Sequence, residues 1–240
     1  MLKNKIAVIT GNPSGIGRVS AALFAREGAE VVCIDDSRDG WTRNEAPHFI
    51  ADVSDRKAIA AIAAECARKL ERADVLFNLP GRAAKQHFEF TTEEIWNQMI
   101  GRNLTAVFNC SQLFLPLMKK APAASIINHA SIDGSLGNPS LAAYSAGKGG
   151  VITLTHVMTH DLGKYRIRVN CISTGAIRDG APRSEDATRV AVTPLGRTGT
   201  PEDIARVALF LASEMSSYVN EENIVADGGR TGITQGCIED

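Results

Sequence analysis

Short apolar segments alternate with longer alanine-rich segments along the whole of this 240-residue chain. Within the short segments the hydrophobic residues stand consecutively and many are β-branched, which is typical of parallel strands covered by helices on both faces. The sequence therefore predicts a doubly wound α/β fold in a single domain, residues 1–240. Strands are expected at residues 5–10, 29–35, 48–53, 73–78, 124–130, 166–172 and 223–229. Helices are expected at residues 15–28, 55–70, 91–119, 141–163 and 201–213.

Composition excludes several classes of partner. The chain is 44% hydrophobic and 22% charged, with a formal net charge of -1 and scattered basic residues, so neither a nucleic-acid nor a membrane-surface interaction is expected. Five widely separated cysteines without a C-x-x-C pair favour a reducing compartment. The N-terminal residues do not resemble a signal peptide, and we expect a cytoplasmic protein.

Three glycines mark the turn between the first expected strand and helix. In residues 10–17 (TGNPSGIG), Gly11, Gly15 and Gly17 have the spacing G-x-x-x-G-x-G, and the helix is expected to begin near Ser14. Glycines let the backbone approach a ligand, and the free amides of a helix N-terminus favour a pyrophosphate. The spacing is neither G-x-G-x-x-G nor a Walker loop, so a tight turn without a ligand is the alternative.

The second expected strand ends in two acidic residues, Asp35 and Asp36. They follow the glycines by about 20 residues, where dinucleotide-binding folds place the acid that binds the adenosine ribose. A carboxylate there disfavours the 2′-phosphate of NADP. Arg18 or Arg38 could offset part of this repulsion, but Ser14 is not basic, and the sequence favours NAD over NADP.

Residues 144–148 (YSAGK) suggest a reacting site. Tyr144 and Lys148 are four residues apart in an expected helix and therefore share one face. An ammonium near a phenol lowers the pKa of the phenol, which predicts that Tyr144 exchanges protons with an alcohol or carbonyl. Ser131 follows a strand, where ligands collect in open α/β sheets. Taken singly, each has a simpler explanation, namely a helix surface pair or a turn.

Together these motifs resemble the short-chain dehydrogenase/reductase family over nearly the whole chain. Other matches lie at Asp52 and Val53, in residues 77–81 (FNLPG), at Asn103, and in residues 167–175, 194–205 and 224–229. The resemblance implies a Rossmann-type parallel sheet of about seven strands, a nicotinamide cofactor, and a small-molecule alcohol or ketone substrate. It also implies a homotetramer or homodimer.

The resemblance also implies roles for individual residues. Tyr144 would exchange a proton with the substrate oxygen, and Lys148 would lower its pKa and bind the nicotinamide ribose. Ser131 would orient the substrate oxygen, and Asn103 would hold a water that relays protons outward. The expected cofactor-binding residues are Gly11, Ser14, Gly15, Ile16, Gly17, Asp35, Asp52, Val53, Asn78, Gly81, Tyr144, Lys148, Gly175 and Ile177.

Four positions depart from the family pattern. Leu79 and Pro80 replace the middle of an Asn-Asn-Ala-Gly segment, and Thr174 replaces a proline. Asp179 aligns with a threonine expected to meet the nicotinamide amide. Residues 176–199 form a short substrate loop without clear periodicity, which suggests an open site or one completed by a neighbouring subunit.

The sequence thus predicts an NAD-dependent oxidoreductase that interconverts a secondary alcohol and a ketone. One alternative is an NADPH-dependent carbonyl or 3-oxoacyl-thioester reductase, and another is a non-catalytic dinucleotide-binding scaffold or sensor. No metal is expected, because His156 and His160 have the i, i+4 spacing of a zinc helix without its glutamate or an evident third ligand. Basic residues in the loops leave an anionic substrate possible, with solvated loop charge as the alternative.

Overall fold

Seven parallel strands form one sheet in the computed structural model, which describes residues 1–12, 15–37, 47–181 and 184–232. Their order is β3-β2-β1-β4-β5-β6-β7. The chain thus turns back between β1 and β4, as a doubly wound sheet does. The predicted α/β class and parallel sheet are confirmed. The strands are β1 (Ile6–Thr10), β2 (Glu30–Asp35), β3 (His48–Ile50), β4 (Val75–Asn78), β5 (Ala124–Ser131), β6 (Ile167–Thr174) and β7 (Asn223–Ala226).

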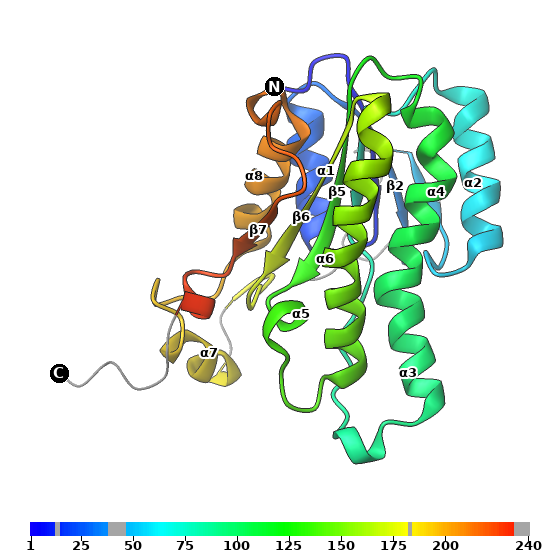
Figure 1. Cartoon of the computed structure of the whole chain (residues 1–240). Coiled ribbons are helices and arrows are strands. Elements are labelled where there is room, and N and C mark those ends of the chain that lie inside the picture. Colours follow the sequence, from blue (N-terminus) through cyan, green and yellow to red (C-terminus); the bar gives the residue numbers. More distant parts are fainter. Residues whose placement is uncertain (13–14, 38–46, 182–183, 233–240) are drawn as a thin grey trace.

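Helices cover both faces of this sheet (Figure 1). On one face α1 (Ile16–Arg26) packs with α8 (Pro201–Ala212) in a hydrophobic core that includes Phe24 and Phe77. On the other face lie α2 (Arg56–Lys69), α4 (Ala106–Met118) and α6 (Ala142–Leu162), around a second core that includes Phe114. Because both faces are covered, β1 and β5 are buried at every residue, as their consecutive apolar pattern predicted.

The long helix expected at residues 91–119 is interrupted. A 3₁₀ turn (Phe88–Phe90) is followed by α3 (Glu93–Ile100), then by a π-helical segment (Gly101–Thr105), and only then by α4. Such π-helical segments insert an extra residue into a helix and are frequent at functional sites. Periodicity alone does not reveal this interruption, since the apolar pattern continues through it.

Other differences concern short elements. The structure contains α5 (Asp133–Leu136) and α7 (Ala187–Ala191), which were not predicted, and α7 lies inside the expected substrate loop. The strands predicted at residues 48–53 and 223–229 end earlier, at Ile50 and Ala226. Both are edge strands with a neighbour on one side only.

Side chains fix the start of several helices. Asp55 accepts hydrogen bonds from the backbone amides of Lys57 and Ala58 at the start of α2. Thr200 and Asp203 form a reciprocal capping box at the start of α8, with Pro201 in its first turn. These caps satisfy amides that would otherwise lack partners.

A line of polar side chains crosses the interior of the sheet. The strand register places Thr10, Asn78 and Asn128 next to one another on β1, β4 and β5. The Asn78 amide nitrogen donates to Ser111 Oγ and to Asn128 Oδ1, both at 3.0 Å, and Thr10 Oγ1 donates to Asn78 Oδ1 at 3.3 Å. Asn128 in turn donates to Thr155 on α6 at 3.0 Å. Asn78 is completely buried, so these bonds replace those it would make with water.

Two further expectations concern compartment and membrane. Cys33, Cys66, Cys110 and Cys171 are buried, and Cys237 lies outside the described residues. Within the described part of the chain, no helix has both the length and the apolar character needed to cross a membrane.

Replacing Asn78 by Ala tests the interior polar line. We expect the free energy of unfolding to fall by about 3 kcal/mol, since several buried partners lose their hydrogen bonds together. Urea denaturation measures this change. The matched control is Asn97→Ala on the exposed face of α3, which should change the unfolding free energy by less than about 0.5 kcal/mol. Equal effects of the two variants would contradict a structural role for this line.

Candidate active site

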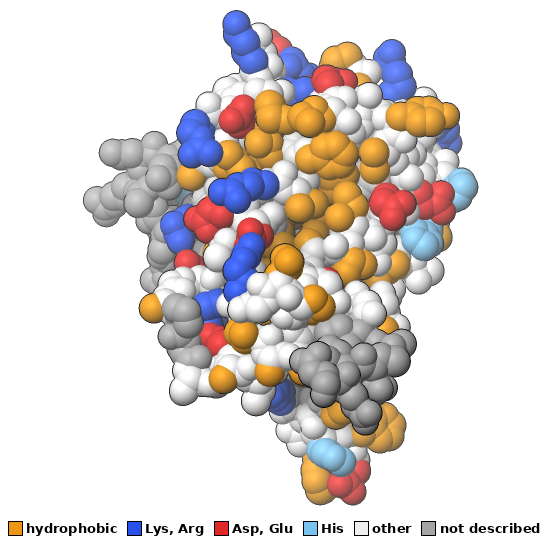
Figure 2. Space-filling model, turned by 90° about the vertical axis from the view of Figure 1, so that its left-hand side faces the viewer, with side chains coloured by type: hydrophobic (Ala, Val, Ile, Leu, Met, Phe, Trp, Pro, Cys, Tyr) orange, Lys and Arg blue, Asp and Glu red, His pale blue; other side chains and the backbone are white. Residues whose placement is uncertain are grey.

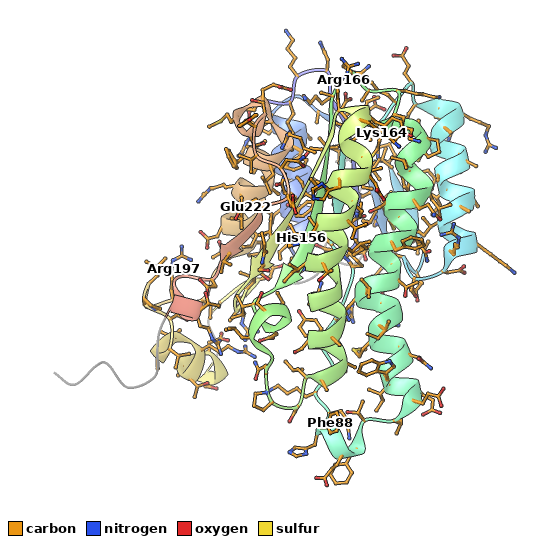
Figure 3. The ribbon with its side chains drawn as sticks, in the orientation of Figure 1. Phe88, His156, Lys164, Arg166, Arg197 and Glu222 are labelled. Carbon is orange, nitrogen blue, oxygen red and sulfur yellow. The ribbon has the colours of Figure 1, made fainter. Side chains whose placement is uncertain are left out.

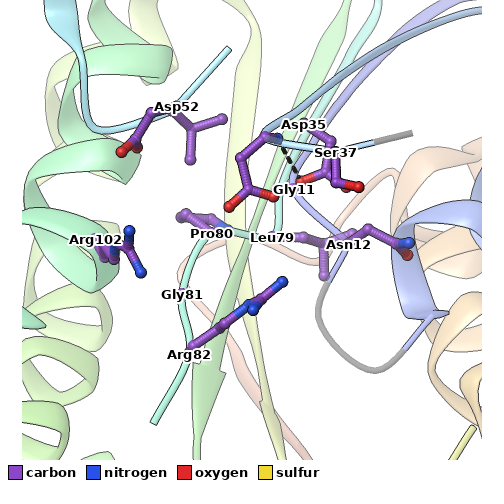
Figure 4. A pocket seen from close by; sticks show the side chains of 12 residues that line it. Gly11, Asn12, Asp35, Ser37, Asp52, Leu79, Pro80, Gly81, Arg82 and Arg102 are labelled. Atoms are coloured by element: carbon purple, nitrogen blue, oxygen red, sulfur yellow. Dashed lines mark hydrogen bonds between the residues drawn. The ribbon is translucent and has the colours of Figure 1, made fainter. Parts of the chain in front are cut away.

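Two hollows lie beyond the carboxyl ends of the strands. The first, which we term the dinucleotide pocket, has a volume of about 170 Å³. It contains the predicted residues Gly11, Asp35, Asp52, Val53 and Gly81 (Figure 4). Segments from β1, β2, β4 and the loop after β3 therefore meet here, as the sequence predicted. The other lining residues are Asn12, Asp36, Ser37, Leu79, Pro80, Arg82 and Arg102.

The glycine turn is closely packed where the chain enters α1. Gly11 and Gly15 have positive φ angles of 81° and 76°, which side chains rarely adopt. A Cβ on Gly11 would collide with the carbonyl of Leu79, and one on Gly17 would collide with the carbonyl of Gly11. The turn therefore needs glycine for its own packing. Ile16 is buried in the core, and the predicted site residue Ser14 lies outside the described residues.

An acidic side chain lies over the N-terminus of α1. A Cβ on Gly15 would collide with the carboxylate of Asp179, and Arg18 Nη2 is 3.3 Å from Asp179 Oδ2. Anions are stabilised at helix N-termini, where backbone amides are free. Asp179 thus brings a negative charge to the place where the sequence predicted a pyrophosphate.

The dinucleotide pocket carries charges of both signs. Asp35 is 9% exposed at the end of β2, and its Oδ1 accepts from the Asp36 amide at 2.9 Å. Figure 4 shows Arg102 on the opposite side of the pocket from Asn12. Burial raises the pKa of Asp52, but hydrogen bonds from Ser54 and the charge of Arg102 outweigh it, and the net pKa is lowered. Asp52 is therefore an acceptor at neutral pH.

Asn78 is one predicted cofactor residue that the structure does not bring to the pocket wall. Its side chain is fully buried and makes the interior hydrogen bonds described above. The family resemblance identified the position, but the strand register directs its amide to Asn128.

The second hollow, which we term the substrate cavity, has a volume of about 680 Å³. Ser131, Tyr144, Gly175 and Ile177 line it, together with Thr174. The register of β5 and β6 pairs Ser131 with Thr174. The Ser131 hydroxyl lies near enough to the Tyr144 hydroxyl to lower the pKa of the phenol, so the two predicted reacting groups are neighbours. The predicted groups therefore meet at the wall of a cavity large enough for a small molecule.

Lys148 is buried beside this cavity, with 1% of its surface exposed. Its Nζ donates to the backbone carbonyls of His129 at 2.9 Å and Pro80 at 3.1 Å. Burial lowers the pKa of Lys148 to about 7. The lysine thus changes charge near neutral pH, and the proline at position 80 supplies one of its acceptors.

The expectation that Lys148 lowers the pKa of Tyr144 is wrong for the free protein. Burial raises the pKa of Tyr144 to about 12, the neighbouring Ser131 hydroxyl lowers it in part, and the charge of Asp133 raises it further. Lys148 Nζ lies 5.9 Å from the centre of the Tyr144 ring and is turned toward the two carbonyls. Desolvation of the phenolate therefore exceeds the influence of the lysine.

Asn103 lies in the π-helical segment and is completely buried. Its Nδ2 donates to the carbonyl oxygens of Met99 at 3.0 Å and Arg82 at 3.3 Å, whereas its Oδ1 has no hydrogen-bond partner among the described residues. A Cβ on Gly81, where φ is 116°, would collide with this oxygen and would lie 3.4 Å from Lys148 Nζ. A buried acceptor without a partner next to the lysine is suited to binding a water.

His129 is a polar group of the site that sequence reasoning missed. It is 5% exposed in the middle of β5; its Nδ1 is 3.4 Å from Lys148 Nζ and its Nε2 is 3.1 Å from Thr174 Oγ1. Burial and the charge of Lys148 lower the pKa of His129 well below its ordinary value, so the ring is neutral. A histidine in a fully buried strand, two residues before Ser131, was the available signal.

The histidines that the sequence singled out lie elsewhere. His156 and His160 are exposed on α6, with His156 on its outer side (Figure 3). His160 Nε2 is 3.4 Å from Glu221. Across residues 1–12, 15–37, 47–181 and 184–232, no cluster of His, Cys, Asp and Glu suited to a metal is found.

Replacing Lys148 by Met tests its burial as a titrating group. The pKa of Lys148 is about 7 in the folded chain and 10.5 ordinarily, so between these values the unfolded chain binds more protons. Wild-type stability should therefore rise with pH across this window relative to the variant, by at most about 1.4 kcal/mol per pH unit. Denaturant unfolding at pH 7 and pH 9 measures the difference.

The matched control is Lys57→Met on the exposed surface of α2, which should shift stability equally at both pH values. A stability difference between wild type and Lys148→Met that does not change with pH would show that the lysine keeps its ordinary pKa.

Comparisons with known proteins identify relatives that are oxidoreductases by name. A family model described as "Enoyl-(Acyl carrier protein) reductase" matches residues 10–231. The chain is 36% identical to a 3-oxoacyl-(acyl-carrier-protein) reductase FabG of Thermotoga maritima, over 95% of this chain and 98% of the relative. It is 35% identical to a meso-2,3-butanediol dehydrogenase of Serratia marcescens, over 95% of each chain.

The fold is shared with a solved structure of similar length. The ligand-free aldohexose dehydrogenase of Thermoplasma acidophilum superposes with a TM-score of 0.93, covering 100% of this chain and 98% of that one at 24% identity. That likeness concerns the fold alone. Because the family model and the relatives above 30% identity span nearly the whole sequence, the chain belongs to the short-chain dehydrogenase/reductase family of oxidoreductases.

Proposed function

We propose that the protein is an NAD-dependent oxidoreductase that interconverts a secondary alcohol and a ketone. The observation that carries this proposal is the meeting of Ser131 and Tyr144 at the wall of the substrate cavity, with Lys148 buried behind them. The nicotinamide cofactor would supply or accept the hydride. The protein would bind both reactants and move the proton.

Tyr144 would donate a proton to the ketone oxygen or accept one from the alcohol. With its pKa raised to about 12, the Tyr144 hydroxyl is protonated at neutral pH but is a weak acid, so proton transfer in either direction requires that the phenolate be stabilised. Ser131, which lies beside the Tyr144 hydroxyl, would donate to the same substrate oxygen. A protonated Lys148 would favour the phenolate, and the free Oδ1 of Asn103 would hold the water that takes the proton onward.

The residues of the dinucleotide pocket fit an adenine dinucleotide. Asp35 would accept from ribose hydroxyls, and at Gly11 and Gly81 the backbone itself lies at the pocket wall. A 2′-phosphate about 4 Å from Asp35 would be repelled by about 4 kcal/mol per charge pair at an effective dielectric of about 20. Asp36 adds to this repulsion, whereas Arg82 and Arg102 reduce it. The acidic end of β2 favours NAD.

A reductase that uses NADPH on a carbonyl or 3-oxoacyl thioester is the second candidate. The relative at 36% identity, whose name is 3-oxoacyl-(acyl-carrier-protein) reductase, favours it. The two candidates differ in the cofactor that the protein prefers, because both would use the same tyrosine chemistry.

Further features support a homotetramer or homodimer in the cytoplasm. The edge strand β7 has a neighbour on one side only, and Figure 2 shows hydrophobic side chains gathered over this side of the molecule. Val225 on β7 is 47% exposed, and nearby in sequence Tyr218 is fully exposed. An uncovered apolar edge of this kind is a common place for association. Buried, dispersed cysteines suit a reducing compartment.

Replacing Tyr144 by Phe tests the proposed chemistry. Removal of the hydroxyl should lower kcat for alcohol oxidation by at least about 100-fold, because only the proton-transfer step loses its group. The affinity for NADH, measured by fluorescence titration, should change by less than about twofold. The assay uses a panel of secondary alcohols with NAD.

The matched control is Tyr218→Phe, which removes an exposed hydroxyl far along the chain from the site and should retain wild-type turnover. Full activity in Tyr144→Phe would remove Tyr144 from the mechanism.

Replacing Asp35 by Ala tests cofactor selection. The affinity for NADH should fall about tenfold or more, because charge-assisted hydrogen bonds to the ribose are lost. The affinity for NADPH should fall less or rise, since repulsion of the 2′-phosphate is relieved. Calorimetric titration with each cofactor measures both, and Asp161→Ala on the exposed surface of α6 is the control. An unchanged ratio of the two affinities would mean that other residues select the cofactor.

A further inference from the structure

The substrate cavity carries more positive charge than its own carboxylates neutralise. Four cationic side chains line it, whereas Asp133 is the only lining carboxylate among the described residues. Asp133 also accepts a hydrogen bond from Asn138 at 3.2 Å. The cationic residues are Lys85, Arg178, Arg189 and Arg230.

Two of these cations share one buried carboxylate. Asp186 is 2% exposed and accepts from Arg178 Nε at 2.9 Å and Nη2 at 2.5 Å, and from Arg189 Nη1 at 3.2 Å. One buried carboxylate thus holds two guanidinium groups at the cavity wall. The short helix α7, which carries Arg189, is held close to the cavity by the same interactions.

Arg230 is different, since its half-buried side chain forms no ion pair or hydrogen bond with residues in the described ranges. Its backbone is nonetheless well fixed. Asp227 accepts from the amide of Gly229 at 2.8 Å and from that of Thr231 at 2.6 Å, on either side of Arg230. Gly175 packs directly on Asp227, where a Cβ would lie 2.8 Å from Asp227 Cβ, and this brings the turn to the end of β6.

Lys85 lies on the wall formed by the loop after β4. Its neighbour Gln86 donates a backbone hydrogen bond to Ser140 at 2.8 Å, which ties this loop to the one that follows α5. Lys85 is exposed, and like Arg230 it has no ionic partner in the described part of the chain. Fixed loops therefore present two unpaired cations to the cavity that contains Ser131 and Tyr144.

We infer that the substrate of this site carries an anionic group, a carboxylate or a phosphate, and that Arg230 binds it. This inference rests on the proposed function, because it names the substrate class of the same site. The cavity would hold the reacting carbon at Tyr144 and the anion at Arg230. A guanidinium binds carboxylate and phosphate oxygens through two parallel hydrogen bonds, which gives orientation as well as affinity. Lys85 would attract the same anionic group by its positive charge, from a greater distance than Arg230.

Two properties of Arg230 make it a better anion site than an ordinary surface arginine. Its partial burial weakens screening by water, so an ion pair there is stronger than an exposed one. Its fixed backbone reduces the conformational entropy lost when the ligand binds. Arg178 and Arg189 are already bound to Asp186. Their positive charges would attract the anionic group of the substrate without any rearrangement of these side chains.

Titration of the intact protein with unreactive ligands tests the inference. Straight-chain carboxylates and alkyl phosphates, each paired with a neutral amide or alcohol of the same length, are titrated by calorimetry with and without NADH. At least one anionic series should bind about tenfold more tightly than its neutral partner, the effect of one charge-assisted ion pair. That preference should disappear in Arg230→Met and recover partly in Arg230→Lys. Arg206→Met on the exposed surface of α8 is the matched control and should keep it.

The two anionic series distinguish the source of the charge, since a carboxylate site and a phosphate site differ in which series binds. Equal affinity for anionic and neutral ligands, a preference that survives in Arg230→Met, or no anion binding at all would each overturn the inference. Because calorimetry needs no turnover, these results do not depend on the Tyr144→Phe experiment, which tests the proposed function by itself.

Discussion

The ammonium of Lys148 is buried at the centre of the site, and the surrounding strands are arranged to supply its acceptors. The carbonyls of His129 on β5 and of Pro80 after β4 lie 2.9 Å and 3.1 Å from its Nζ. The approach of the Pro80 segment requires glycine at position 81, since a side chain there would collide with Asn103. Burial of one cation thus connects α6, the central strands and the π-helical segment, and it lowers the pKa of Lys148 to about 7.

The sequence was informative where one local pattern determines one structure. Consecutive apolar residues identified all seven strands, and the spacing of Tyr144 and Lys148 indicated that they share one face of a helix, where the ammonium lies 5.9 Å from the centre of the tyrosine ring. The sequence was uninformative where tertiary packing determines the local structure or the pKa of a group. The π-helical turn at Asn103 depends on packing against Gly147 of α6, and the raised pKa of Tyr144 depends on how far the folded chain excludes water.

Charge distribution explains how the two halves of the site could select their ligands. The dinucleotide pocket has an acidic end at Asp35 and Asp36, which favours ribose hydroxyls over a phosphate. Asp179 brings another negative charge to the N-terminus of α1, where Arg18 partly neutralises it. The substrate cavity is basic instead. The two hollows therefore differ in charge: one carries carboxylates and guanidinium groups, and the other is lined mainly by cations.

We propose above all that this site binds NAD and uses it for oxidation and reduction. Parallel fluorescence titrations of the wild-type protein with NADH and with NADPH test it most directly. NADH is expected to bind at least about tenfold more tightly, given the repulsion between Asp35 and a 2′-phosphate. Tighter binding of NADPH would contradict the role given to Asp35 and favour a reductase of carbonyls or oxoacyl thioesters. Failure to bind either cofactor would contradict the assignment of the dinucleotide pocket as a cofactor-binding site.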